Sequence, residues 1–161
     1  MKSRTVVIVI DGVLRKVIGN DPIPDGLILF SALASKFSVV LLSAKDGDVA
    51  WLAEQGVQYD MMLSYDMVSA TEGMSHANRV DTLRFEYGYD IALVVEPDPE
   101  QGANLFDAGY TVLGFMHPSY SHPSWRPGYE GEMQGWADLA ESVKQDRLLR
   151  VKDQRTDIDV D

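Results

Sequence analysis

Three polar side chains each come directly after a run of apolar, mostly β-branched residues. They are Asp11, Ser43 and Glu96, which follow residues 6–10, 39–42 and 92–95. Runs of this kind are typical of strands buried on both faces of a parallel sheet. The carboxyl ends of parallel strands meet at one edge, where open α/β sheets bind ligands, so we expect these side chains to lie close together. Carboxylates and a hydroxyl at such an edge could transfer protons or bind a hard cation.

Val9 and Asp11 lie two residues apart at the end of the first apolar run. Side chains two apart in an extended chain point the same way, and Gly12 allows a sharp turn after them. Asp11 therefore suits acid–base chemistry, whereas Val9 has no atom that could act as a nucleophile or bind a metal. A plain strand-ending turn would also place Asp before Gly. Asp98, which precedes a proline, could in the same way simply cap a helix.

The alternation of apolar runs with helical segments predicts an α/β fold with a doubly wound, parallel, five-stranded sheet. The expected strands are residues 5–10, 38–42, 61–64, 91–95 and 111–115. The expected helices are residues 26–36, 46–55, 75–87 and 100–108. Glycine follows three of these helices, as is common at helix ends. We expect residues 1–151 to form a single domain, because no repeat or domain boundary interrupts them.

The C-terminal third has a different composition. Residues 117–131 are rich in proline, histidine, serine and aromatic residues, which indicates an ordered loop at the carboxyl edge of the sheet. Residues 136–151 are expected to form a final helix, and residues 152–161 a charged, flexible tail. The loop side chains that could contact a ligand or a protein partner are His117, Tyr120, His122, Trp125 and Arg126. Two histidines five apart could bind a metal, but an aromatic loop packed over the sheet edge is the favoured interpretation.

Composition excludes several kinds of site. The chain has no cysteine, which rules out disulfides, thiolate metal sites and a cysteine nucleophile. No apolar run reaches the roughly 18 to 20 residues that a membrane-spanning helix needs. A formal net charge of −11 opposes non-specific binding to nucleic acid. A small phosphorylated ligand stays compatible with this charge, because a local cation or a metal ion can hold it.

The stretch Val-Val-Ile-Val-Ile-Asp-Gly-Val-Leu at residues 6–14 resembles the first motif of the haloacid dehalogenase superfamily of phosphohydrolases. There a strand ends in Asp-x-Asp-Gly, and the first aspartate attacks phosphorus while the second protonates the leaving group. The resemblance implies that Asp11 stands at the acid/base position and that Val9 replaces the nucleophile. Residues 39–43 resemble the second motif, in which Ser43 would hydrogen-bond the phosphoryl group. Arg79 is the candidate for the cation of the third motif.

Residues 92–100 resemble the fourth motif, whose acids hold Mg²⁺. The resemblance implies Glu96 and Asp98 as metal ligands, although glutamate is longer than the usual aspartate and Pro97 replaces a common second acid. It covers about residues 5–116 and implies a central first strand with no more than a minimal cap. Pro-Ser-Trp-Arg-Pro at residues 123–127 is similar to a segment of small superfamily members encoded by actinobacterial viruses.

The missing nucleophile decides the predicted function. We expect a catalytically impaired pseudophosphatase that is retained as a binding or assembly module with a protein partner. One alternative is an active, Mg²⁺-dependent phosphohydrolase that acts on a nucleotide or a nucleic-acid end. Another is a structural component of a viral particle. The expected location is the cytosol, which for a viral protein means the host cytosol or the virion.

Overall fold

The computed structural model describes residues 4–17, 19–43, 45–64 and 75–117, together with residues 141, 144, 145 and 148. Five strands alternate with four helices along these residues. The strands are β1 (Thr5–Val9), β2 (Ser38–Leu42), β3 (Met61–Leu63), β4 (Ile91–Glu96) and β5 (Val112–Gly114). The helices are α1 (Pro24–Ala34), α2 (Asp48–Glu54), α3 (His76–Phe85) and α4 (Pro99–Asp107).

The strands form one parallel sheet in the order β3-β2-β1-β4-β5, which confirms the predicted fold class. The first strand is central, and every residue of β1 is buried. The chain order reverses between β1 and β4, so the ligand-binding switch point of this fold lies where these two strands end. Val95 of β4 pairs with Ile8 of β1 there.

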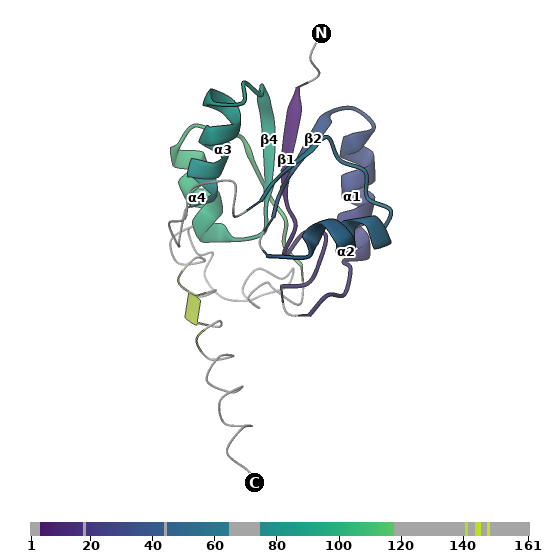
Figure 1. Ribbon diagram of the computed structural model, residues 1–161. Helices are drawn as coiled ribbons and strands as arrows, with labels where there is room; N and C mark the ends of the chain where they lie inside the picture. Colours follow the sequence, from purple (N-terminus) through teal and green to yellow (C-terminus); the bar gives the residue numbers. More distant parts are fainter. Residues whose placement is uncertain are drawn as a thin grey trace.

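Helices cover both faces of the sheet, with α1 and α2 on one face and α3 and α4 on the other (Figure 1). Side chains of β1 alternate between the two layers, as the pleat of a strand requires. Val6 and Ile8 belong to the apolar cluster that contains Trp51 of α2. Val7 and Val9 belong to the opposite cluster, which includes the apolar side chains Val80, Leu83 and Leu105 of α3 and α4.

The first strand ends at Val9, one residue earlier than predicted. The backbone turns there, because the carbonyl oxygen of Ile10 accepts hydrogen bonds from the amides of Leu14 at 2.9 Å and Arg15 at 3.1 Å. Side chains of an extended strand alternate between the two faces of the sheet, and this alternation therefore stops before Asp11. Residues 10–23 join β1 to α1, and their described part forms turns and two isolated bridges, which agrees with the predicted minimal cap.

Two glycines let this turn pack closely against its neighbours. Gly12 has a φ of +95°, and a Cβ built on it would lie 2.7 Å from Cγ of Pro97, which follows β4. A Cβ on Gly26 of α1 would lie 1.6 Å from the carbonyl oxygen of Val13. A side chain at either place would clash, so the turn after β1 is fitted to both α1 and the turn after β4.

The remaining differences from the predicted elements lie at their ends. Glu96 is the last residue of β4 and pairs with Gly114, so it lies in the sheet rather than after it. Within the expected final helix, the four described residues are helical. Tyr120, His122, Trp125 and Arg126 lie outside the described residues. No helix in the described part of the chain is both long enough and apolar enough to cross a membrane.

Candidate functional site

Arg15 is a buried cation at the carboxyl edge of the sheet. Arg15 as a whole is 1% exposed. Its Nε lies 2.7 Å and its Nη2 lies 2.6 Å from Oδ1 of Asp11. The same Nη2 donates to Oδ1 of Asp48, also at 2.6 Å. Its guanidinium carbon lies 5.1 Å from the ring centroid of Trp51, within the range of a cation–π contact. One guanidinium thus neutralises charge on two carboxylates.

Local structure brings these groups together. Asp48 is the first residue of α2 and is 2% exposed, so its carboxylate enters the site from the helix that follows β2. Arg15 is held by the turn after β1, where its carbonyl oxygen accepts a hydrogen bond from the amide of Gly12 at 2.7 Å. The indole nitrogen of Trp51 donates to the carbonyl oxygen of Asn20 at 2.8 Å, which fixes the ring beside the guanidinium.

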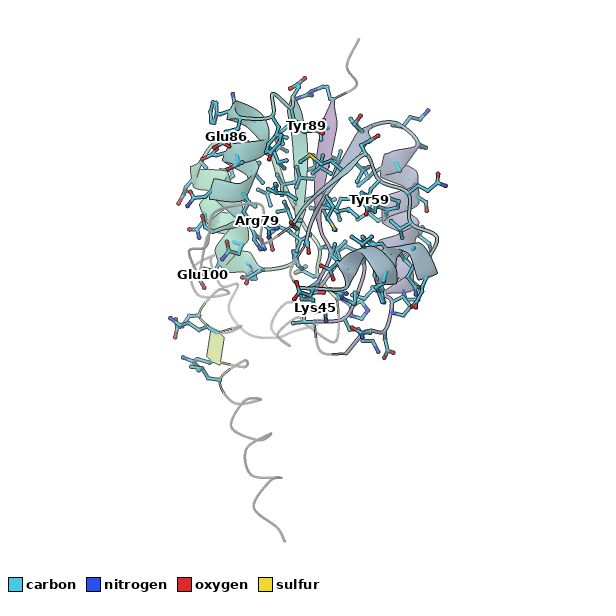
Figure 2. The ribbon with its side chains drawn as sticks, viewed as in Figure 1. Lys45, Tyr59, Arg79, Glu86, Tyr89 and Glu100 are labelled. Carbon is cyan, nitrogen blue, oxygen red and sulfur yellow. The ribbon has the colours of Figure 1, made fainter. Side chains whose placement is uncertain are left out.

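Ser43 belongs to the same network. It follows β2 and is 3% exposed, and its Oγ donates to Oδ2 of Asp48 at 2.6 Å. The hydroxyl expected to contact a phosphoryl group therefore contacts a buried carboxylate. Lys45 lies beside this network at the carboxyl edge (Figure 2), and its backbone amide lies 3.3 Å from Oδ2 of Asp48.

Arg79, the predicted cation of the third motif, bonds to the backbone of two neighbouring strand ends. It is buried in α3, and its Nη2 donates to the carbonyl oxygens of Ser43 at 2.7 Å and Leu63 at 2.6 Å. The side chain extends from α3 toward the sheet (Figure 2) and joins the ends of β2 and β3. Another residue of α3, His76, contacts Glu96 at the end of β4.

Glu96 and His76 form a second, partly buried pair. The Glu96 side chain is fully buried, and its Oε2 lies 2.5 Å from Nδ1 of His76. Its other oxygen, Oε1, accepts a hydrogen bond from the amide of Asp98 at 2.9 Å. His76 is held in turn by its amide, which donates to Oε1 of Gln101 at 2.9 Å. Burial raises the pKa of Glu96 above its ordinary value of 4.5, and the hydrogen bond and charge of His76 oppose this shift.

Asp98 caps α4, which is the second of the two interpretations that the sequence left open. Its Oδ1 accepts a hydrogen bond from the amide of Glu100 at 2.9 Å, and Pro99 begins the helix. His117 is half-buried after β5. The rest of the loop that was expected to contact a ligand or partner lies outside the described residues.

The acids do not fit the Mg²⁺ site that the resemblance implies. Asp11 is bonded to Arg15, both oxygens of Glu96 have hydrogen-bond partners within the protein, and Asp98 caps a helix. Within residues 4–17, 19–43, 45–64 and 75–117, no three His, Cys, Asp or Glu side chains are grouped to hold a metal ion.

Sequence reasoning missed Arg15, Asp48 and His76. Arg15 was the one available signal, since it is a charged residue that directly follows the apolar pair Val13-Leu14 after Asp11. Asp48 looked like an ordinary acid in the first turn of a helix, where negative charge is common. His76 looked like a polar residue at the start of a helix.

Comparison with known proteins supports the fold. No family model matches the sequence, and no curated protein matches it. Fourteen chains of solved structures do match. Two belong to the Pnkp1/Rnl/Hen1 RNA repair complex, with TM-scores of 0.56 and 0.54 at 13% and 16% identity. Each alignment covers 71% of this chain but only 43% and 46% of those chains, so this chain spans less than half their length.

A third match is the core domain of a proposed phosphoglycolate phosphatase from Streptococcus pneumoniae TIGR4. It aligns with a TM-score of 0.52 at 14% identity and covers 89% of this chain and 97% of that one. At such identities the similarity establishes the fold alone. The chain has a Rossmann-like α/β fold that is consistent with the haloacid dehalogenase superfamily.

Arg15→Met should cost about 3 to 5 kcal/mol of unfolding free energy, because it leaves the buried carboxylate of Asp48 and the part-buried carboxylate of Asp11 without their cation. Lys16→Met is the matched control. Lys16 is the next residue and pairs with Asp21 on the surface at 3.2 Å, so its loss should cost at most about 1 kcal/mol. Urea denaturation measures both. Equal, small losses in the two variants would show that the buried network contributes little.

Glu96→Gln should change how stability depends on pH. The pKa of Glu96 is higher in the folded protein than its ordinary value of 4.5, so above pH 4.5 the unfolded chain releases this proton first. The contribution of Glu96 to the unfolding free energy of the wild type should therefore fall as pH rises through this range, and the variant should lack this loss. Denaturation at a series of pH values should show the unfolding free energy of the variant rising relative to that of the wild type as pH increases. This difference should then level off.

Glu100→Gln removes a negative charge from an exposed position nearby and controls for net charge. A difference between wild type and Glu96→Gln that stays constant with pH would contradict the assigned direction of the pKa shift.

Proposed function

We propose that this chain is a pseudophosphatase, in which a fold consistent with that of haloacid dehalogenase-like phosphatases is retained as a protein-binding or assembly module. The observation that carries the proposal is the bonding of Asp11 to Arg15, which also binds Asp48. A general acid must reach the reacting oxygen at hydrogen-bond distance. The Oδ1 of Asp11 already contacts two nitrogens of a buried guanidinium.

The nucleophile position supports the same conclusion. Val9 is 4% exposed and packs in the apolar cluster beneath α3 and α4. It has no atom that could form a phosphoenzyme, and loss of a covalent route normally costs several orders of magnitude in rate. Val9 and Asp11 also make contacts with different layers of the fold, because the chain turns at Ile10.

The other positions implied by the resemblance are also engaged in internal contacts. Ser43 donates to Asp48, Arg79 donates to backbone carbonyls, and Glu96 is paired with His76. Each of these polar groups therefore has a partner within the protein. Such pairing stabilises a scaffold rather than a reaction, which favours retention of the fold for binding.

A protein partner is the favoured ligand. The net charge of −11 would repel nucleic acid and would favour a partner with a basic surface. Two of the similar structures are chains of a multi-protein complex, so this fold is compatible with assembly. We further propose that the chain is of viral origin, in line with its resemblance to the small proteins of actinobacterial viruses.

A phosphatase assay tests the catalytic half of the proposal. Wild type, Asp11→Asn and Val9→Asp are compared on an aryl phosphate and on nucleotides with Mg²⁺. Wild type and Asp11→Asn should both give only background rates, since neither has a nucleophile. Activity that appears only in Val9→Asp would support the proposal further. Wild-type turnover that Asp11→Asn abolishes would instead establish an active phosphohydrolase.

Affinity capture from the native source is the binding arm of the same test. A tagged wild-type chain should retain a stoichiometric protein partner at physiological salt. Co-purification with particle proteins would identify a structural component of the virion. Capture of nucleic acid without protein would contradict the proposed partner class.

A further inference from the structure

We propose that residues 136–151 dock as an amphipathic helix on the open half of the sheet, which is the face of β4 and β5 on the side of α1 and α2. The occupant is a segment of this same chain, and a tethered segment is favoured over a free partner because it is always close by. The inference goes beyond the proposed function and does not rest on it.

The open half of the sheet is evident in one row of side chains across the central strand. Val6 of β1 pairs with Val39 of β2 on one side and with Leu93 of β4 on the other, and all three pack in the layer of α1 and α2. Val39 is 1% exposed, whereas Leu93 is only half-buried. On β5, Leu113 pairs with Val95 and is 40% exposed. Parallel sheets are almost always covered on both faces, so the described residues leave this half without its full cover.

The chain leads from this open half into the proposed occupant. β5 ends at Gly114, and the continuous described chain stops at His117. In Figure 1 the four described residues of the segment 136–151 lie apart from the sheet, so docking changes the position of this segment. Residues 118–135 span up to about 60 Å when extended. A helix of residues 136–151 is about 24 Å long, close to the roughly 20 Å of a strand such as β4, so it can lie along the open half.

The sequence of the segment predicts one apolar stripe. Four apolar residues follow the i, i+3, i+4, i+7 spacing of a single helix face. They are Trp136, Leu139, Ala140 and Val143. The four described residues have the same spacing on a different face, and all of them are helical and exposed. They are Glu141, Lys144, Gln145 and Leu148. An exposed face combined with an apolar stripe is typical of a helix that covers a core.

Charge favours the same contact. Between positions 144 and 152 the sequence has four basic residues and one acidic residue, a net charge of +3. The described residues between 4 and 117 have seven basic and fourteen acidic residues, a net charge of −7 with histidine neutral. The basic end of the segment is therefore attracted to the acidic body of the protein.

Thiol labelling tests the docking, because the chain has no cysteine and one introduced thiol reports on one position. Leu113→Cys in the full-length chain is labelled with a maleimide under native conditions, alone and together with Val143→Asp. Val143→Asp should accelerate labelling about tenfold or more, because burial of a valine side chain favours docking by about that factor. Gln145→Asp introduces the same charge on the exposed face and should leave the rate unchanged. Asn104→Cys, on the exposed surface of α4, should react at one rate in all three backgrounds.

A disulfide test identifies the occupant directly. Leu113→Cys combined with Val143→Cys should form a disulfide within one chain when dilute protein is oxidised, and its mass should stay that of a monomer. Asn104→Cys combined with Val143→Cys should stay reduced, because α4 covers the opposite face. Equal labelling of Leu113→Cys with and without Val143→Asp would overturn the proposal, and so would a disulfide-linked dimer, which would make a second copy the occupant. None of these readouts depends on phosphatase activity.

Discussion

The guanidinium of Arg15, bonded to Asp11 and Asp48, is the contact on which the carboxyl edge of this sheet depends. It joins the turn after β1 to the first residue of α2 across 33 positions of sequence. Ser43 and Trp51 are arranged around it, one through Asp48 and the other through its ring face. An ion pair this deeply buried needs near-complete hydrogen bonding to offset its desolvation. Oδ1 of Asp11 and both oxygens of Asp48 accept hydrogen bonds within this network.

The edge contains a second pair built in the same way. Glu96 is fully buried in β4 and contacts His76 at the start of α3. Gly12 and Pro97 pack together between the two pairs, so the turns after β1 and β4 are fitted to each other. Polar side chains that pair with one another thus occupy the edge of the sheet where this type of fold binds ligands. A scaffold with its polar groups paired internally suits binding through its outer surface.

Pattern in the sequence was sufficient to predict the sheet, because each buried strand leaves a continuous apolar run. It also offered the cap at Asp98 as an alternative, since capping is local and needs only the residues next to the helix. The bonds of Arg15 to Asp48 and of His76 to Glu96 span 33 and 20 residues and have no local signature. Arg79 was placed in the correct helix, but only tertiary structure shows that it bonds to the carbonyl oxygens of Ser43 and Leu63.

The most direct measurement is a crystal structure of the wild-type chain grown with excess Mn²⁺, examined by anomalous scattering. We expect the guanidinium of Arg15 to lie between Asp11 and Asp48, with no anomalous peak at bonding distance from either carboxylate. A manganese ion bound between these two carboxylates, with Arg15 turned away, would contradict it.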